Sequence, residues 1–561
     1  MKIIVVGGVA GGASAAARLR RLDEQAEIIL FEKGEYISYA NCGLPYYIGN
    51  VIKERNKLLV QTAASFSERF NIEVRTLSEV LSIDTENKQV SVRNQSTGEV
   101  YNESYDKMVL SPGADPIRPP LPGINLDGIF TLRNVNDTDY IKAHITEKKI
   151  KSAVVVGAGF IGIEMAENLH HVGVEVSVIE MGDQILAPLD FPMASIVQQH
   201  VREKGVSLKL KTAVQGFEKD GDKLIANLNT GEKLTTDLVI LSIGVRPDTH
   251  LAKDAGLALG KANGIFVNEY LQTSNPDIYA VGDAIEFENS IINQSMITYL
   301  AGPANKQGRM AADNLVMGNV KKYNGAINTA IVKVFDLTVA AAGMAFKHLE
   351  RFNIEHIVST THSGSHAGYY PDSQQMTIQL AFSPKDGRLL SGQVVGREGV
   401  DKRIDVLSSV IARKSDIYEL TEFEHAYAPP FSSAKDPVNM AGFVAENILQ
   451  KKMQVVYWKD VAENKDNAFI LDARNPDEHA RENIAGAVNI PVDQLRNRLD
   501  ELPKDRKIFV YCEVGLRGYL ASRILLQSGF PETYNISGGM KLYHNCHAER
   551  ELLNEPVLQE A

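Results

Sequence analysis

Two stretches of this sequence follow the same plan: a run of β-branched residues enters a glycine-rich turn, and a helix-forming segment follows. In the more complete stretch, Ala153 to Val156 leads into Gly157-Ala158-Gly159-Phe160-Ile161-Gly162. A continuous apolar run predicts a buried parallel strand, and the glycines let the backbone turn sharply and approach a bound group. The spacing therefore predicts a βαβ unit whose helix N-terminus faces a pyrophosphate.

The segment after this turn supports a dinucleotide site. A helix is expected through about His171, followed by a strand from Val174 to Ile179 and then Glu180, eighteen residues past Gly162. A carboxylate there would accept from a ribose hydroxyl and repel a 2′-phosphate, which favours NADH over NADPH. The residues expected to bind the nicotinamide cofactor are Gly157, Gly159, Phe160, Ile161, Gly162, Glu180 and Gly244.

The N-terminal stretch repeats the pattern with one departure. Ile3 to Val6 enters Gly7-Gly8-Val9-Ala10-Gly11-Gly12, a helix is expected through about Arg21, and strand Glu27 to Phe31 ends at Glu32. Val9 stands where the middle glycine of a G-x-G-x-x-G turn normally lies, and a turn without a nucleotide is the alternative. Two such sites in one chain predict FAD and NADH, with hydride passing between them.

Three later segments are expected near these sites. Met108 to Ala114 and Leu238 to Pro247 are buried strands ending in small-residue turns, suited to crossings between domains. The stretch from Thr273 to Asp283 resembles the second flavin motif of the pyridine nucleotide-disulfide reductase family, in which the aspartate meets the ribityl chain. The alternative for Asp283 is a helix N-cap, and both roles can hold at once.

The stretch Ser38 to Tyr46 contains Cys42, the only cysteine in the first five hundred residues. The usual flavin-disulfide pattern needs a second cysteine a few residues later, where this chain has Pro45, Tyr46 and Tyr47. A disulfide at Cys42 must therefore be made with sulfur from outside the chain. The alternative is a buried structural cysteine that acts as a small apolar side chain.

Residues 1 to about 450 resemble a coenzyme A disulfide reductase of this flavoprotein family. The resemblance rests on the Asn41-Cys42 stretch, the first glycine-rich turn, and the segments His366 to Pro371, Gly399 to Asp405 and Tyr427 to Lys435. It implies an FAD site formed by Gly7, Gly8, Ala10, Gly11, Gly12, Glu32, Lys33, Val80, Ser111, Gly113, Gly282, Asp283 and Tyr427.

The same resemblance implies coenzyme A as substrate or bound ligand. The residues expected to contact it are Ser14, Arg18, Arg21, Ser38, Asn41, Asn305 and Lys435. Basic side chains suit the phosphorylated ADP portion of coenzyme A. The alternative for Arg18, Arg20 and Arg21 is a solvated helix face.

Residues from about 325 to 450 resemble the dimerisation domain of these reductases, which lies over the partner's active site. The resemblance implies a homodimer in which Tyr369 and Tyr427 approach Cys42 across the subunit boundary. A phenol there could donate a proton to a departing thiolate. Core or interface packing is the alternative for both tyrosines.

The last hundred residues change pattern. This region contains a strand from Ala468 to Arg474 and a strand from Ile508 to Tyr511, and the second strand leads into Cys512-Glu513-Val514-Gly515-Leu516-Arg517. It resembles a rhodanese domain. Such a strand-to-helix turn aims backbone N–H groups at one point, and Arg517 with the helix dipole is expected to add positive potential that stabilises a persulfide anion on Cys512. The C-x4-R spacing is one residue shorter than the phosphatase loop, which favours sulfur over phosphate. Rhodanese-like modules without activity are the alternative, and Cys546 is given no role.

Length and composition complete the expected organisation. The chain has 561 residues, too many for one core, and its net charge of −11 argues against general affinity for nucleic acid or membrane. Three cysteines and no long apolar run indicate a cytoplasmic protein, and no metal site is expected. The expected fold is α/β: a discontinuous FAD domain (1–118 and 245–322), an NAD(P)H domain (119–244), both Rossmann-like, an α+β dimerisation domain (323–450) and an α/β rhodanese domain (455–550).

These features predict an FAD-dependent, NADH-driven reductase of sulfur–sulfur bonds that uses Cys42. Coenzyme A persulfide, polysulfide and coenzyme A disulfide remain open as substrates, with the rhodanese loop arguing for sulfane sulfur. One alternative is an NADH oxidase or peroxidase cycling Cys42 through a sulfenic acid, although such relatives carry a histidine where this chain has Ala10. Another is a sulfur carrier or redox sensor whose flavin half is only a scaffold.

Overall fold

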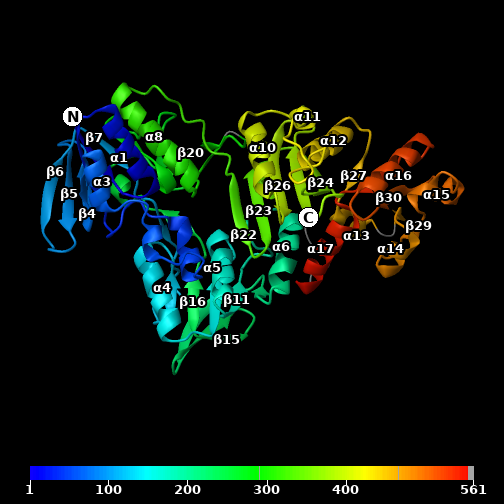
Figure 1. Ribbon diagram of the computed structural model, residues 1–561, viewed down its shortest axis with the longest axis horizontal. Helices are drawn as coiled ribbons and strands as arrows, with labels where there is room; N and C mark the ends of the chain where they lie inside the picture. Colours follow the sequence, from blue (N-terminus) through cyan, green and yellow to red (C-terminus); the bar gives the residue numbers. More distant parts are fainter. Residues whose placement is uncertain (290, 465–466, 554–561) are drawn as a thin grey trace. The chain divides into compact units, whose positions relative to one another are not determined.

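The computed structural model describes residues 1–289, 291–464 and 467–553, and the chain divides into two compact units (Figure 1). The first unit comprises Met1–Ile179 and Thr212–Asn328, and the second comprises Glu180–Lys211 and Thr329–Ala561. None of the helices within the described residues has both the length and the hydropathy that a membrane crossing needs.

The N-terminal glycine-rich turn follows the central strand of a five-stranded parallel sheet in the first unit, in the order β19-β7-β1-β2-β3. These strands are β1 (Lys2–Val6), β2 (Glu27–Phe31), β3 (Glu73–Arg75), β7 (Lys107–Leu110) and β19 (Ile278–Ala280). Strands β1, β2 and β7 are buried along nearly their whole length, as expected for parallel strands covered on both faces.

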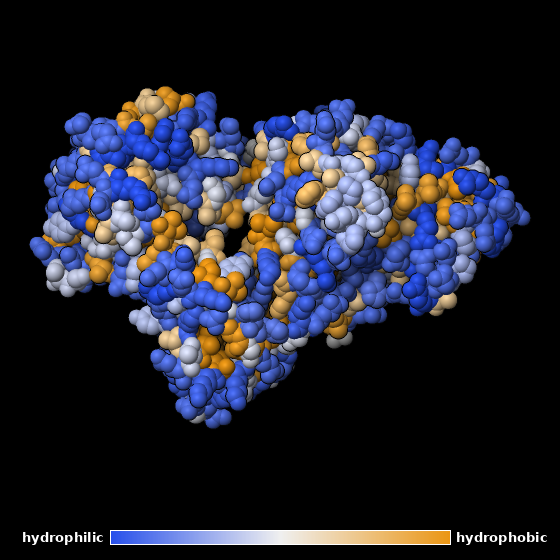
Figure 2. Space-filling view, in the orientation of Figure 1, coloured by the Kyte–Doolittle hydropathy of each residue, from blue (hydrophilic) through white to orange (hydrophobic). Residues whose placement is uncertain are grey.

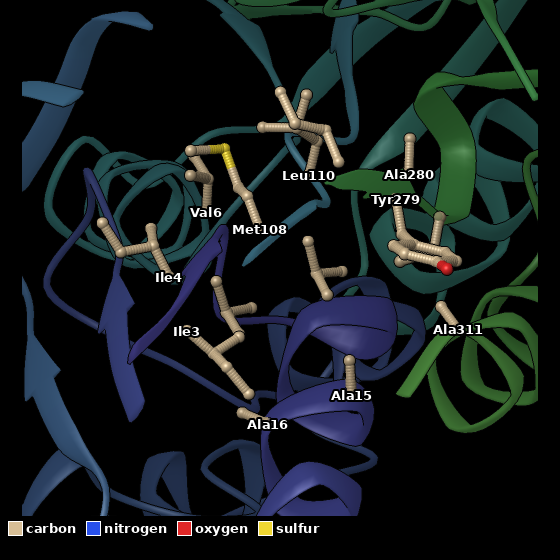
Figure 3. Packing of buried hydrophobic residues seen from close by; sticks show 14 of the residues in the cluster. Ile3, Ile4, Val6, Ala15, Ala16, Met108, Leu110, Tyr279, Ala280 and Ala311 are labelled. Atoms are coloured by element: carbon tan, nitrogen blue, oxygen red, sulfur yellow. The ribbon is translucent and has the colours of Figure 1, made fainter. Parts of the chain in front are cut away.

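Helices α1 (Ala10–Leu22) and α8 (Ala301–Met317) pack against each other beside this sheet (Figure 1). Ile3 of β1 lies in one buried cluster with Ala15 and Ala16 of α1 and Ala311 of α8 (Figure 3). Small side chains let these elements approach closely, which holds the start of α1 at the end of β1.

The second glycine-rich turn belongs to another parallel sheet, in which the first unit contributes strands in the order β11-β10-β16-β9. They are β9 (Ile129–Thr131), β10 (Ser152–Val156), β11 (Glu175–Ile179) and β16 (Leu238–Leu241), accompanied by helices α4 (Val135–Glu147) and α5 (Phe160–His171). The two segments expected to cross between domains lie side by side where they end, because β8 (Ala114–Pro116) pairs antiparallel with β17 (Val245–Pro247).

Antiparallel strands complete the first unit. Two three-stranded meanders are formed by β4 (Ser78–Asp84), β5 (Gln89–Asn94) and β6 (Val100–Ser104), and by β13 (Val214–Asp220), β14 (Lys223–Leu228) and β15 (Lys233–Thr236). A third small sheet is mixed: β20 (Ile285–Asn289) pairs in parallel with β18 (Ile265–Phe266) and antiparallel with β21 (Gln294–Met296).

The second unit contains a five-stranded antiparallel sheet in the order β22-β23-β26-β25-β24. Its strands are β22 (Ala330–Val334), β23 (Leu337–Gly343), β24 (Ile357–Gly364), β25 (Gln375–Phe382) and β26 (Leu389–Gly396). Helices α10 (Val400–Ala412) and α12 (Pro437–Leu449) pack on this sheet, and α11 (Ile417–Glu422) packs on α12 (Figure 1).

The C-terminal domain of the second unit is a parallel sheet in the order β27-β31-β30-β28-β29. Its elements are β27 (Val455–Val456), α13 (Trp458–Glu463), β28 (Ala468–Asp472), α14 (Pro476–Arg481), β29 (Val488–Asn489), α15 (Val492–Leu495), β30 (Lys507–Tyr511), α16 (Leu516–Gln527), β31 (Thr533–Ile536) and α17 (Gly539–Leu552). The expected α/β fold class is confirmed.

One strand of this domain is shorter than the sequence predicts. Strand β28 ends at Asp472 rather than Arg474, because the Asp472 carboxylate accepts the Arg474 N–H at 3.0 Å and turns the chain. The turn draws Arg474 back against Asp472, and this pair lies beside the Cys512 loop described below.

Helix α17 packs against α6 (Phe191–Glu203) through both apolar and charged contacts. The Glu549 carboxylate is fully buried and accepts from Gln198 Nε2 at 2.6 Å and from Arg202 at 2.5 Å. Nearby, Trp458 stacks on Phe191 with ring centroids 5.7 Å apart. A buried carboxylate is stable only while its partners stay in place.

Arg202→Met should therefore lower the free energy of unfolding of the second unit by roughly 3 kcal/mol, because it leaves Glu549 without its cation. Trp458 is the only tryptophan of the chain and lies at this contact, so its fluorescence during denaturant unfolding reports the change. Arg413→Met is the control, since it breaks an exposed ion pair with Glu419 and should cost less than about 1 kcal/mol. Equal losses would contradict a stabilising role for Arg202.

Candidate functional site

The turn between β1 and α1 is built from backbone atoms in direct contact. Gly7 has φ +92°, and a Cβ on Gly12 would lie 1.8 Å from the Gly7 carbonyl oxygen. A Cβ on Gly7 would lie 2.1 Å from the Ser111 carbonyl oxygen at the end of β7. No side chain fits at either position, so the glycines hold the start of α1 against the carboxyl edge of the sheet.

A cavity of about 480 Å³ opens at this edge. Its lining contains most of the residues expected at the FAD site: Gly7, Ala10, Gly11, Glu32, Lys33, Val80, Ser111, Gly113, Gly282 and Asp283. Gly8 and Gly12 lie behind the turn, where a Cβ on Gly8 would meet Ile37 and Leu30. Tyr427 belongs to the other unit.

The acidic residue at the end of β2 is held in place by backbone donors. Glu32 accepts from the Gly8 N–H at 2.9 Å and from the Gly34 N–H at 2.8 Å. Its carboxylate is thus fixed at the cavity wall, the place where a ribose hydroxyl of a dinucleotide would donate. The glycine cradle and this carboxylate fit an adenine dinucleotide such as FAD.

Asp283 lines the same cavity within a short 3₁₀ turn, Gly282–Ala284. Burial raises the pKa of its carboxyl group, and the Arg133 cation counteracts the rise. The alternative interpretation as a helix N-cap is wrong, because Val281 holds that position and no side chain caps the turn. The side chain is therefore available to a polar ligand in the cavity.

Cys42 also lines this cavity. It lies in a 3₁₀ turn, Asn41–Gly43, directly before α2 (Leu44–Ile48), and its side chain is exposed. The alternative of a buried structural cysteine is therefore wrong. Shielding from water by the surrounding protein, followed by the carboxylates of Glu164 and Asp283, raises the pKa of the Cys42 thiol.

Sequence patterns give no functional role to two residues near Cys42, Tyr46 and Glu164. The Tyr46 hydroxyl of α2 donates to Glu164 Oε1 of α5 at 3.2 Å. Burial raises the pKa of Glu164 to about 7, with Glu167 adding to the rise. Glu164 stands two residues past Gly162 on the helix, but only the packing of α2 on α5 reveals that it reaches the Cys42 turn.

The second glycine-rich turn repeats the construction of the first. A Cβ on Gly162 would lie 2.0 Å from the Gly157 carbonyl oxygen, and Gly157 itself has φ +100°. Gly159 is the N-cap of α5, which begins at Phe160 and continues through Ile161. Gly244, with φ +116°, follows β16.

Glu180 directly follows β11 and begins the second unit. Its carboxylate accepts the Gly182 N–H at 2.7 Å. The glycine turn before α5 therefore offers the same backbone cradle for a pyrophosphate as the first one does, with Glu180 in the corresponding chain position.

The residues expected to contact coenzyme A differ in their surroundings. Ser14 donates to Asn305 at 2.5 Å, and Asn41 lines the cavity with Cys42. Arg18 is ion-paired with the buried Asp313 at 2.6 Å, and Arg21 is exposed. Ser38 adopts φ +45° beside Cys42 in the chain, and Lys435 is exposed in the other unit.

The solvated-face alternative for the arginines of α1 is wrong for Arg20. That side chain is only 4% exposed and donates to the carbonyl oxygens of Asp23, Glu24, Phe70 and Asn71. These hydrogen bonds hold the end of α1 against the turn that follows it and against the end of α3 (Ala63–Phe70). Periodicity could not reveal this role, because the acceptors are backbone atoms and two of them, in Phe70 and Asn71, are 50 and 51 residues away.

Tyr369 and Tyr427 come together in the second unit. Their hydroxyl groups are 2.9 Å apart, and the side chains are 76% and 48% exposed. Packing in the core of the chain is therefore wrong for both. Phe431, 70% exposed, lines a cavity of about 470 Å³ together with Tyr427.

Cys512 lies at the end of β30 in the strand-to-helix turn that the sequence predicts. Its side chain is 1% exposed, and the Gly515 N–H donates to its Sγ at 3.1 Å. The first residues of α17 close the turn from the other side, since the Met540 N–H donates to the Cys512 carbonyl at 2.8 Å. A Cβ on Gly539 would lie 2.5 Å from that carbonyl oxygen.

Arg517, which is expected to add positive potential to this turn, faces both Glu478 and Cys512, and these two groups raise the pKa of its guanidinium, with Glu478 as the larger cause. Arg517 is bound through both guanidinium nitrogens to the Glu478 carboxylate of α14, at 2.5 and 2.6 Å. The Arg517 cation is the main cause that lowers the pKa of Glu478 to about 2. The carboxylate that pairs with Arg517 is thus 39 residues away in the chain.

Cys546, which the sequence gives no role, is fully buried between α17 and α6. Its Sγ lies 3.8 Å from Ser195 Oγ, and burial raises the pKa of the thiol to about 12. It acts as a small apolar side chain of the helix contact. Within the described ranges, no group of three or more histidine, cysteine or acidic side chains could hold a metal ion.

Residues 1–310 match the model of the pyridine nucleotide-disulphide oxidoreductases, and residues 457–546 match the rhodanese-like domain. The chain belongs to the pyridine nucleotide-disulphide oxidoreductase family. Coenzyme A disulfide reductase of Staphylococcus haemolyticus is 38% identical over 447 residues, which are 80% of this chain and 100% of that enzyme.

Two solved structures resemble the whole oxidoreductase chain. Reduced CoADR-RHD of Bacillus anthracis is 48% identical with a TM-score of 0.96, covering 98% of both chains. An NAD-dependent persulfide reductase from A. fulgidus is 37% identical with a TM-score of 0.91, covering 97% of this chain and 100% of that one. The water-forming NADH oxidase of Lactobacillus brevis is more distant, at 26% identity, a TM-score of 0.77, and coverage of 81% and 99%.

Glu164→Gln should shift the pH dependence of Cys42 alkylation to lower pH. Above about pH 7 the Glu164 carboxylate is charged and raises the pKa of the Cys42 thiol, so its removal makes the thiolate easier to form. The rate of iodoacetamide labelling at Cys42 against pH, followed by mass spectrometry, measures the shift. Glu175→Gln at the exposed start of β11 is the control, and identical profiles for both variants would contradict the effect.

Proposed function

We propose that this oxidoreductase uses NADH and FAD to reduce sulfur–sulfur bonds of coenzyme A disulfide, coenzyme A persulfide or polysulfide. The observation that carries the proposal is the position of Cys42, exposed in the cavity at the first glycine-rich turn. The coenzyme A disulfide reductases and the persulfide reductase similar to this chain support the choice of substrate.

In this proposal Cys42 forms the covalent intermediate. Its thiolate attacks a coenzyme A persulfide, the sulfur–sulfur bond breaks, and HS⁻ leaves while Cys42 is bound to coenzyme A through a disulfide. FAD, held at the first glycine-rich turn, would supply two electrons taken from NADH. Two-electron reduction of the mixed disulfide would release the coenzyme A thiolate and restore the Cys42 thiolate.

The chain's residues would hold the cofactors at their two glycine turns. Gly7, Gly11 and Glu32 would bind the ADP portion of FAD, with Ser111, Gly113 and Asp283 along the rest of the cavity. Gly157, Gly159 and Gly162, with Glu180 after β11, would bind NADH in preference to NADPH. Ser14, Arg21, Ser38, Asn41, Asn305 and Lys435 are the proposed coenzyme A contacts, and Arg18 would need to leave Asp313 to join them.

A homodimer would place Tyr369 and Tyr427 at the active site of the partner subunit. Their exposed, hydrogen-bonded hydroxyl groups support this assignment, because a phenol pair can donate a proton to the departing thiolate. The segment 323–450 would then be the dimerisation domain, following a discontinuous FAD domain (1–118 and 245–322) and an NAD(P)H domain (119–244).

The C-terminal domain, residues 455–550, would handle sulfane sulfur as a persulfide on Cys512. The Gly515 N–H already donates to Sγ, and the turn before α16 directs further backbone donors toward the sulfur. The three cysteines are all free, which supports a reducing compartment such as the cytoplasm.

Oxidase or peroxidase activity at Cys42 is the less supported alternative. The water-forming oxidase resembles this chain at 26% identity, against 48% for CoADR-RHD. Turnover on oxygen or peroxide should accordingly be far slower than turnover on coenzyme A persulfide.

Cys42→Ser should abolish NADH-coupled reduction of coenzyme A persulfide, because the hydroxyl cannot take the place of the thiolate nucleophile. Anaerobic steady-state kinetics measure the loss, and the flavin absorbance of the purified variant shows that FAD stays bound. Cys546→Ala is the matched control, since that thiol is sealed between two helices and should leave turnover unchanged. Normal turnover by Cys42→Ser would refute the proposed mechanism.

A further inference from the structure

Arg517, the cation that faces Cys512 in a turn suited to an anionic sulfur, is itself paired with a carboxylate. Arg517 is bound to Glu478 by two hydrogen bonds of 2.5 and 2.6 Å. Glu478 is held in turn by the Asn475 N–H at 3.0 Å, as part of the cap of α14. The pair is therefore fixed by α14 rather than formed by chance between two surface side chains.

Two further cationic or titratable side chains near the turn, Arg474 and His479, are also paired with carboxylates. Arg474 binds Asp472 at 2.9 Å and Glu513 at 3.0 Å, and His479 binds the same Asp472 at 2.9 Å. Lys541 follows the start of α17, where burial lowers its pKa and the Glu513 carboxylate opposes that effect. Among the described residues, Arg474 and Arg517 are thus ion-paired with Asp472 and Glu478, whereas Lys541 hydrogen-bonds Gln375 and only its pKa reflects the Glu513 carboxylate.

The surface beside the turn is apolar. Leu516, the residue before Arg517, is 61% exposed, and Leu520 is 46% exposed one helical turn later. Figure 2 shows hydrophobic side chains at the surface over α16, at the right of the view. An alkyl chain can pack on two exposed leucines, whereas a small dianion gains nothing from them.

We propose that the Cys512 site takes sulfane sulfur from an alkyl persulfide and discriminates against thiosulfate, and that Glu478 sets this preference by compensating Arg517. The inference rests on the proposed function of the C-terminal domain. Thiosulfate carries two negative charges to the thiolate, so it needs a free cation at the turn. A persulfide presents its outer sulfur at the end of an uncharged arm that can lie on Leu516 and Leu520.

The transfer is balanced and needs no oxidant. The Cys512 thiolate attacks the outer sulfur of R–S–SH, the sulfur–sulfur bond breaks, and RS⁻ leaves. The proton of the persulfide passes to the departing thiolate, which gives RSH and a persulfide anion on Cys512. With thiosulfate, the same attack would release sulfite.

The test uses the full-length flavoprotein carrying Cys42→Ser, so that sulfur is taken up only at Cys512. Intact-mass spectrometry follows the gain of one sulfur atom from coenzyme A persulfide, from pantetheine persulfide, which lacks the phosphates, and from thiosulfate. We expect both persulfides to load Cys512 at least about tenfold faster than thiosulfate at equal concentration. Faster or equal loading by thiosulfate overturns the inference alone, whereas loading by none of the three overturns it together with the proposed sulfur-transfer function.

Glu478→Gln should leave the Arg517 cation beside Cys512 without its carboxylate partner, so the rate constant for loading from thiosulfate should rise. The ratio of the persulfide rate constant to the thiosulfate rate constant should therefore fall about tenfold. Glutamine keeps the capping acceptor of α14, so the fold is preserved. Glu501→Gln breaks an equally bidentate pair with Arg498 in the same domain and should leave the ratio unchanged. The double variant Glu478→Gln, Arg517→Gln should lose the faster loading from thiosulfate. An unchanged ratio in Glu478→Gln alone overturns the inference.

Discussion

Contact between backbone atoms at glycine turns is the constraint on which both halves of this oxidoreductase depend. Cβ atoms on Gly12 and Gly162 would lie 1.8 and 2.0 Å from the carbonyl oxygens of Gly7 and Gly157. A similar contact recurs at Gly539 beside the Cys512 turn. In each case a helix can begin at the carboxyl edge of a parallel sheet only because a side chain is missing, and the ligand or reactive sulfur lies at that edge.

Cys42 and Cys512, the two cysteines of the proposed reactions, have different electrostatic surroundings. Cys42 is exposed in its cavity, and the nearby carboxylates of Glu164 and Asp283 oppose its ionisation. Cys512 is buried, with a backbone N–H at its sulfur and paired charges around it. In the proposed function, Cys42 would therefore depend on bound groups to favour its thiolate, whereas the Cys512 turn itself supplies a donor to the sulfur.

Much of this architecture could be predicted from the sequence, because spacing in the chain reflects local geometry. The turns at Gly7 and Gly157, the placement of Cys42 after the first βαβ unit, and the strand-to-helix turn at Cys512 all follow from short segments. Pairings between distant segments could not be predicted. Arg517 meets Glu478, Arg20 meets the carbonyl oxygen of Asn71, and Tyr46 meets Glu164 only after the helices have packed.

Helix α17 makes the C-terminal domain inseparable from the rest of the second unit. Its first residues touch the Cys512 carbonyl, and its later turns cover Phe191, Ser195 and Gln198 of α6. Cleavage of the chain near residue 453 followed by loss of the C-terminal domain would therefore expose the apolar face of α6 and leave Arg202 without Glu549. The apolar side chains of α6 that α17 covers would then face water, so the solubility of the reductase depends on the domain that follows it.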